Sequence, residues 1–132
     1  MSTSVVCGYA FNRTRRQYLA TRLAVANTHW SRLCGLVGKA SSDFQQEHGL
    51  WIVPCRGIHT LGMRFPIDVI YLTPGNVVLH LEQTVAPWRF APVRFQAASV
   101  LELPANTVRS TGTTIGDQLE IDIRTPGVSA PA

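Results

Sequence analysis

The chain has 132 residues, 45 % of them hydrophobic and 15 % charged. This is the size and composition of one folded domain, which we expect over residues 1–124, followed by a disordered proline- and alanine-rich tail at 125–132. No run approaches the ~20 apolar residues of a membrane span, no secretory leader is recognisable, and three cysteines without paired spacing argue against a disulfide framework, so we expect a cytoplasmic protein.

The first two predicted elements are strands at residues 5–11 and 17–26, joined by an arginine-rich turn. The formal charge of +4 is concentrated here, because residues 1–42 hold six basic side chains and no acid. Arg13, Arg15 and Arg16 lie near aromatic residues, an arrangement that also occurs in nucleic-acid-binding patches. We favour a polar hairpin tip, so no nucleic-acid partner is expected.

A short helix is predicted next, through about Val37. One of its faces carries four apolar residues at i, i+3, i+4 and i+7: Trp30, Leu33, Cys34 and Val37. Gly38 can end this helix with a left-handed residue. A further turn opening at Ser41 or Ser42 and a strand at 50–53 follow it.

The clearest hairpin joins a strand at 67–72 to a return strand at 77–85. The first strand is apolar on both faces except at Asp68, which predicts a central position in the sheet. Proline and glycine occupy the central positions of the connecting turn, which predicts a type II turn over 73–76. This turn sets a register that places Asp68 opposite Leu81, on the core face.

Two further strands are predicted at 98–103 and 118–123, each with leucine or isoleucine alternating inward. Six or seven short strands with one or two helices predict a mostly β (α+β) fold. We expect a compact open barrel or sandwich with a helix packed on it.

Asp68 is the acid that this predicted fold buries. A buried carboxylate without partners is strongly destabilising or shifts its pKa upward, so Asp68 must be paired or hydrogen-bonded. We favour a structural anchor that ties down the loop at 57–66 or pairs with Arg64. A ligand-binding or proton-transfer group at the mouth of a cleft is the alternative.

The segment before Asp68 holds Cys55, His59 and Met63 at spacings of four. Thiolate, imidazole and thioether ligands suit copper(I) better than zinc. Glycines and prolines in this segment argue against the helix that would align them, and no C-x-x-C or H-x-x-x-H pattern is present, so no metal or other cofactor is expected. A hydrolytic site made of Cys55, His59 and Asp68 would require contacts that the spacing does not reveal.

The segment Trp88–Phe95 alternates aromatic residues with Arg89 and Arg94 in a long proline-rich connection. Such a loop on a rigid scaffold is a candidate recognition surface for an anionic ligand or a partner protein. The alternative is that the aromatic residues only pin the loop to the fold. Glu102, in the strand that follows, is a further candidate that would face Asp68 or an arginine.

The chain resembles the domain-of-unknown-function 192 family of bacteria and archaea in several segments. These are C-x-x-I-H-T-x-x-M-x-F-P-I-D-V-I-Y-L from Cys55, S-V-L-E-L-P-A from Ser99, G-D from Gly116, and the upstream R-x-x-G-L from Arg32. The resemblance covers roughly residues 20 to 123 and implies a β-rich fold with peripheral helices and no established activity. Asn106 stands where relatives have glycine, and it can adopt the same positive φ.

The leading hypothesis is a non-enzymatic domain that binds an unknown small molecule or protein in a cleft. This cleft would be bordered by the His59–Asp68 segment, Glu102 and the Trp88–Phe95 loop. The expected ligand-binding residues are His59, Met63, Arg64, Asp68, Trp88, Arg89 and Glu102. A hydrolytic enzyme that uses Cys55, His59 and Asp68 is the alternative, and a copper- or zinc-binding protein is the second alternative.

Overall fold

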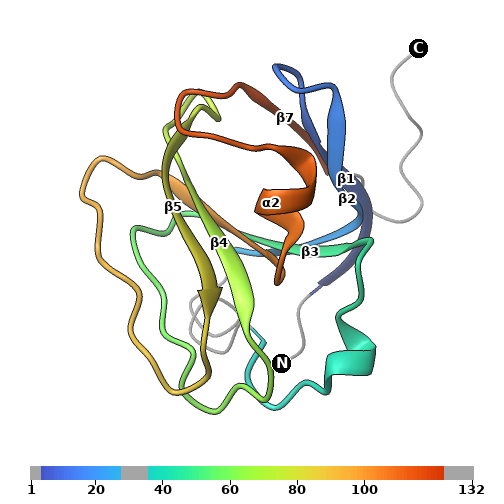
Figure 1. Cartoon of the computed structure of the whole chain (residues 1–132), viewed down its shortest axis with the longest axis vertical. Helices are drawn as coiled ribbons and strands as arrows, with labels where there is room; N and C mark the ends of the chain where they lie inside the picture. Colours follow the sequence, from blue (N-terminus) through green and yellow to red (C-terminus); the bar gives the residue numbers. More distant parts are fainter. Residues whose placement is uncertain (1–3, 28–35, 124–132) are drawn as a thin grey trace.

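The computed structural model describes residues 4–27 and 36–123 (Figure 1). In chain order the elements are β1 (Ser4–Asn12), β2 (Gln17–Ala26), the 3-10 helix η1 (Ser41–Asp43), β3 (His48–Ile52), β4 (Ile67–Leu72), β5 (Val78–Val85), β6 (Ser99–Pro104), α2 (Thr107–Thr111) and β7 (Leu119–Asp122). Most of the predicted helix before Gly38, including Cys34, and the predicted tail lie outside the described residues. None of the helices in these two ranges is long and apolar enough to cross a bilayer.

The strands form one curled sheet with the order β5-β4-β6-β3-β2-β1-β7. Neighbouring strands are antiparallel except β2 and β3, which are parallel. The two edges of the sheet meet at one end, where Val77 bridges Gln118 and the amide of Val78 donates to the carbonyl of Asp117 at 2.9 Å. This curled half-barrel confirms the predicted mostly β open barrel.

Both faces of the sheet are buried, as the central strand β4 shows. All six of its residues are buried, and they alternate between two separate cores. The inner core is closed by α2, which lies against the inner side of the curl (Figure 1). The outer core is covered by the loops at 53–66 and 86–98, which contribute Met63, Phe65, Ala91 and Ala97. A side chain of β4 or β6 therefore packs either in the inner core beneath α2 or in the outer core beneath the two loops, depending on its face of the sheet.

The β4–β5 turn differs from the predicted type II turn. The residue with positive φ is Asn76, at 62°, and not Gly75. The amide of Asn76 donates to the carbonyl of Thr73 at 2.9 Å, and the amide of Thr73 donates to the carbonyl of Val77 at 3.0 Å. The connection is therefore a three-residue loop that ends in a left-handed residue, a geometry that asparagine accommodates well.

The register of the hairpin changes with this turn, so the predicted pairing of Asp68 with Leu81 is wrong. Leu81 pairs with Ile70 instead, and Asp68 falls at an irregularity between the pairs Ile67–Val85 and Val69–Glu82. Asp68 still lies on a core face, as predicted, because its partner across β6 is Leu103 of the inner core.

The β1–β2 turn is a polar hairpin tip that is held to the loop before β7. The carboxylate of Asp117, which is buried, accepts hydrogen bonds from Asn12 Nδ2 at 2.9 Å, from Arg15 Nε at 3.0 Å and from the Thr114 amide at 3.0 Å. Burial alone would raise the pKa of Asp117, but these hydrogen bonds and the Arg15 charge outweigh it and lower the pKa to about 2. Arg15 thus has a structural role in this turn.

The helix α2 was not predicted from the sequence. It has only five residues, between Asn106 with φ 75° and Gly112 with φ 69°. Asn106 therefore takes the positive φ expected of it. A helix this short offers too few turns for an apolar periodicity to be recognisable.

Candidate functional site

Asp68 is a fully buried anchor for two backbone amides. Its Oδ1 accepts from the amide of Thr84 at 2.9 Å, and its Oδ2 accepts from the amide of Val108 at 2.9 Å. Asp68 therefore ties a kink in β5, where Thr84 has φ 52°, to the start of α2. The predicted anchoring role fits, but the predicted partners are wrong, since Asp68 holds neither the 57–66 loop nor Arg64, which is exposed.

The Cys55–Met63 segment lies over the other face of the sheet. The thiol of Cys55 donates to the carbonyl of Gly57 at 3.1 Å, and His59 Nδ1 accepts from the Leu61 amide at 3.2 Å. Met63 is 3 % exposed and packs in the outer core. Across residues 4–27 and 36–123, no group of three or more His, Cys, Asp or Glu side chains is placed to hold a metal ion.

The hydrolytic alternative needs Asp68 beside His59, and the fold separates them. Asp68 faces the inner core, whereas the loop that carries His59 covers the outer core. Both oxygens of Asp68 are already engaged by backbone amides. The arrangement of Cys55, His59 and Asp68 that this alternative requires is therefore not assembled.

Glu102 is buried at the centre of the sheet, on the outer-core face. It is 2 % exposed and lies between Leu50 of β3 and Val69 of β4. Asp68 pairs with Leu103, the next residue of β6, so the two acids point to opposite faces of the sheet. Of the two partners considered for Glu102, Asp68 is therefore excluded. The Oε1 atom of Glu102 has no hydrogen-bond partner within the described residues, and burial raises the pKa of this side chain to about 8.

The two loops over the outer core run side by side as a loop pair, defined here as residues 53–66 and 86–98. Thr60 is the main connection: its amide donates to the Arg89 carbonyl at 2.7 Å, and its hydroxyl donates to the Ala86 carbonyl at 2.7 Å. The amides of Ala91 and Arg94 then donate to carbonyls of the facing loop, at Ile58 and Arg56. This ladder brings His59 and Phe90 into an antiparallel bridge and holds the 86–98 loop in place.

A surface pocket of about 480 Å³ lies where the 86–98 loop crosses β5. Its lining residues are Leu79, His80, Val93, Arg94, Phe95 and Gln96. The Nη2 atom of Arg94 lies 3.3 Å from Nε2 of His80, which also contacts a carboxylate oxygen of Glu82. The pocket thus combines a guanidinium, an imidazole and an amide with apolar walls.

Tyr71 supports the back of this pocket. It is fully buried, its ring lies 5.2 Å from that of His80 in an edge-to-face contact, and its hydroxyl donates to the Pro92 carbonyl at 2.6 Å. Burial, aided by the nearby Glu82 charge, raises the pKa of Tyr71 to about 12, so it remains a donor at neutral pH. The contact fixes the loop above His80.

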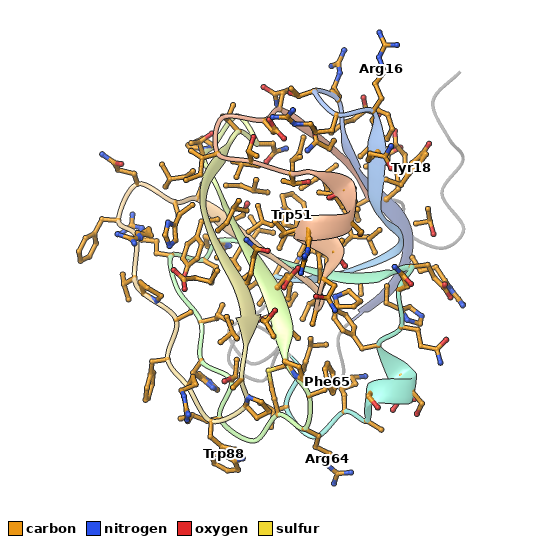
Figure 2. All side chains as sticks on the ribbon, in the orientation of Figure 1. Arg16, Tyr18, Trp51, Arg64, Phe65 and Trp88 are labelled. Atoms are coloured by element: carbon orange, nitrogen blue, oxygen red, sulfur yellow. The ribbon has the colours of Figure 1, made fainter. Side chains whose placement is uncertain are left out.

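The remaining candidates from the sequence lie on the loop pair. Trp88, Arg89 and Arg64 are all exposed. Figure 2 shows Trp88 and Arg64 projecting outward from the same end of the molecule, away from the labelled Trp51 near α2. The structure therefore leaves Arg64, Trp88 and Arg89 exposed on the loop pair, holds His59 half-buried beside Phe90, and places Met63, Asp68 and Glu102 in the interior.

The comparison with protein families decides where this fold belongs. The model of the domain-of-unknown-function 192 family (DUF192), described as an uncharacterized ACR, matches residues 10–121. The chain belongs to the DUF192 family. No curated protein matches it significantly.

Two solved structures have the DUF192 chain's fold. One is a protein of unknown function from Novosphingobium aromaticivorans DSM 12444, with a TM-score of 0.71 and 18 % identity over 86 % of this chain and 82 % of that one. The other is described as a candidate transcription regulator from Sinorhizobium meliloti 1021, with a TM-score of 0.74 and 20 % identity over 91 % of this chain and 95 % of that one. At these identities the likeness establishes the fold of this DUF192 member and nothing about its ligand.

The sequence indicated Arg94 as part of a candidate recognition loop, but it did not indicate the pocket that Arg94 forms with His80. The sequence does place His80 and Glu82 two residues apart in one predicted strand, so their side chains share a face of the sheet. Their neighbours Tyr71 and Arg94 come from other segments, so the pocket depends on strand register and on the path of a loop that no local pattern specifies.

Proposed function

We propose that this protein is a non-enzymatic binding domain whose site is the His80–Arg94 pocket, and that its ligand is a small organic anion with an apolar body. The single observation that carries this proposal is the chemistry of the pocket. Arg94 projects a guanidinium over walls formed by Leu79, Val93 and Phe95.

The charges favour an anionic ligand over a neutral one. The carboxylate in the neighbourhood, Glu82, contacts His80. The contact that Arg94 makes there is with a ring nitrogen of His80, so its positive charge is not neutralised by a carboxylate among the described residues. A ligand carboxylate or phosphate supplies the missing charge and can accept a bidentate pair of hydrogen bonds.

The apolar side chains around Arg94 define the rest of the ligand. Phe95 is 80 % exposed at the rim of the pocket, and a ligand ring that packs against it removes apolar surface from water. The rigid loop ladder keeps the site formed before binding, which lowers the entropic cost of binding. We further propose a cytoplasmic location, which the unpaired spacing of the three cysteines supports.

The test is a titration of 15N-labelled protein with benzoate, with benzamide as the neutral probe of the same shape. We expect benzoate to shift the amide signals of residues 79–80 and 93–96, and benzamide to shift them much less. Arg94→Gln should remove the benzoate response, whereas Arg13→Gln, an exposed arginine of the β1–β2 turn, should retain it. Equal responses to both probes, or an unchanged response in Arg94→Gln, would contradict the proposal.

A further inference from the structure

The loop pair exposes an unusual amount of apolar surface around the proposed pocket. Within eight residues, Trp88 is 64 % exposed, Phe90 77 %, Val93 58 % and Phe95 80 %. Isolated exposed apolar residues are ordinary, but a run of large ones on one loop marks a surface that contacts something. We call this the aromatic–arginine surface; besides these four residues it comprises Arg56, Arg64, Arg89 and Arg94.

The exposure of these rings is built into the fold. Trp88 has a φ of 63°, a left-handed conformation that is unfavourable for a large side chain. Two hydrogen bonds to Thr60 hold Trp88 in this conformation. The Thr60 carbonyl accepts from the Trp88 amide at 2.9 Å, and the Thr60 hydroxyl accepts from the Arg89 amide at 2.8 Å. A backbone strain that keeps an indole in solvent is a reason to look for its role in binding.

The charge of this surface has one sign. Arg56, Arg64, Arg89 and Arg94 are all exposed, and none of them forms an ion pair with a carboxylate in the described parts of the chain. The sequence has no acid between His48 and Ile67, or between Gln83 and Leu101. A symmetric contact with a second copy would place arginine against arginine, so the occupant of this surface must be anionic.

We propose that the aromatic–arginine surface docks on an anionic lipid bilayer, with Trp88 and Phe90 inserted at the boundary between headgroups and acyl chains. Aromatic rings alternate here with arginines and prolines on a projecting loop, so each ring can enter the bilayer while a neighbouring guanidinium reaches a lipid phosphate. A protein partner would need a separate recess for each projecting ring, whereas a bilayer needs no complementary shape.

This inference goes beyond the proposed function and does not rest on it. Trp88, Phe90, Arg64 and Arg89 lie outside the pocket lining. Loss of benzoate binding in Arg94→Gln therefore tests the pocket, and loss of vesicle binding in Trp88 or Phe90 variants tests the docking surface.

The experiment is co-sedimentation of the full chain with vesicles of pure phosphatidylcholine and of phosphatidylcholine with 40 mol % phosphatidylglycerol. We expect binding to the phosphatidylglycerol vesicles and a blue shift of tryptophan fluorescence that is absent in Trp88→Gly. Phe90→Ser should weaken binding roughly tenfold, because a ring no longer leaves water. The double variant Arg64→Gln and Arg89→Gln should weaken it by roughly 25-fold, since each arginine near an anionic surface contributes about fivefold.

A matched control is available at the other hairpin tip. The triple variant Arg13→Gln, Arg16→Gln and Tyr18→Ser removes two exposed arginines and an aromatic side chain that is 57 % exposed, and it should bind vesicles as the wild type does. Trp88→Gly relieves the left-handed strain, so its thermal midpoint should be unchanged or higher while its vesicle binding falls, which separates binding from folding.

Three outcomes would overturn the inference. The first is no binding to phosphatidylglycerol vesicles at low salt. The second is binding that depends on the arginines but not on Trp88 or Phe90, which would mean adsorption of charge without insertion. The third is tight binding of poly-glutamate or a DNA oligonucleotide to the same arginines without vesicle binding, which would assign the surface to an acidic protein or to nucleic acid.

Discussion

Glu102→Gln tests the most unusual interior group of this protein. In the folded chain the carboxyl is surrounded by the outer core and its pKa is about 8, against 4.5 for an exposed glutamate. At a pH between these two values, Glu102 is therefore protonated in the folded state and ionised in the unfolded state. Since the folded state binds more protons in this window, the free energy of unfolding of the wild type falls as pH rises from about 4.5 to about 8.

The size of this effect follows from the pKa difference. One unit corresponds to about 1.4 kcal/mol, so the free energy of unfolding should fall by roughly 3 to 4 kcal/mol between pH 5 and pH 8. The introduced glutamine has nearly the shape of the protonated glutamate and no charge to release, so this contribution to the pH dependence should vanish in Glu102→Gln. The variant should be the more stable of the two at pH 8, and similar to the wild type at pH 5.

The assay is urea unfolding followed by tryptophan fluorescence at pH 5, 6, 7 and 8. Glu47→Gln is the control, because Glu47 is exposed and its contact with Arg22 is long, at 4.0 Å, so its pH profile should match the wild type. The ionisable groups other than Glu102 and Glu47 are common to all three proteins, so their contributions cancel in the differences. Parallel profiles for the wild type and Glu102→Gln would refute a buried, proton-binding Glu102.

Two further predictions concern the anchoring acids. Asp68→Ala should lower the free energy of unfolding by about 3 kcal/mol or more, because the buried amide of Val108 and the partly buried amide of Thr84 lose their side-chain acceptor. Hydrogen exchange at both amides should accelerate, and slow exchange at Val108 would contradict the anchor. Asp117→Asn should cost about 2 kcal/mol at pH 7, because the pKa of Asp117 is lowered from 3.8 to about 2. This contribution to stability is complete above pH 3.8 and disappears as pH falls towards 2. The free energies of unfolding of the wild type and the variant should therefore converge in acid. A constant difference between them down to pH 2 would refute the stabilising role of the Asp117 charge.

The amino-acid sequence by itself determined most of the strands. Alternating and fully apolar runs placed β1, β2, β4 and β5 to within a residue or so, because side-chain periodicity and turn residues are local properties. It also determined that the strand at 67–72 is central, since only a strand between two others is apolar on both faces. The need for Asp68 to have partners followed from the energetic cost of burying a carboxylate.

Only the tertiary structure decided which partners these residues have. One left-handed residue, Asn76, changed the hairpin register and with it the neighbour of Asp68. The face of the curled sheet on which an acid lies decides whether it contacts a loop or a helix. Asp68 and Glu102 lie on opposite faces because they belong to adjacent residue pairs of β4 and β6. The aromatic–arginine surface depends on the hydrogen bonds by which Thr60 fastens two loops that are distant in the sequence. The His80–Arg94 pocket depends on the contact by which Tyr71 holds the second loop over β5, and no local pattern encodes either contact.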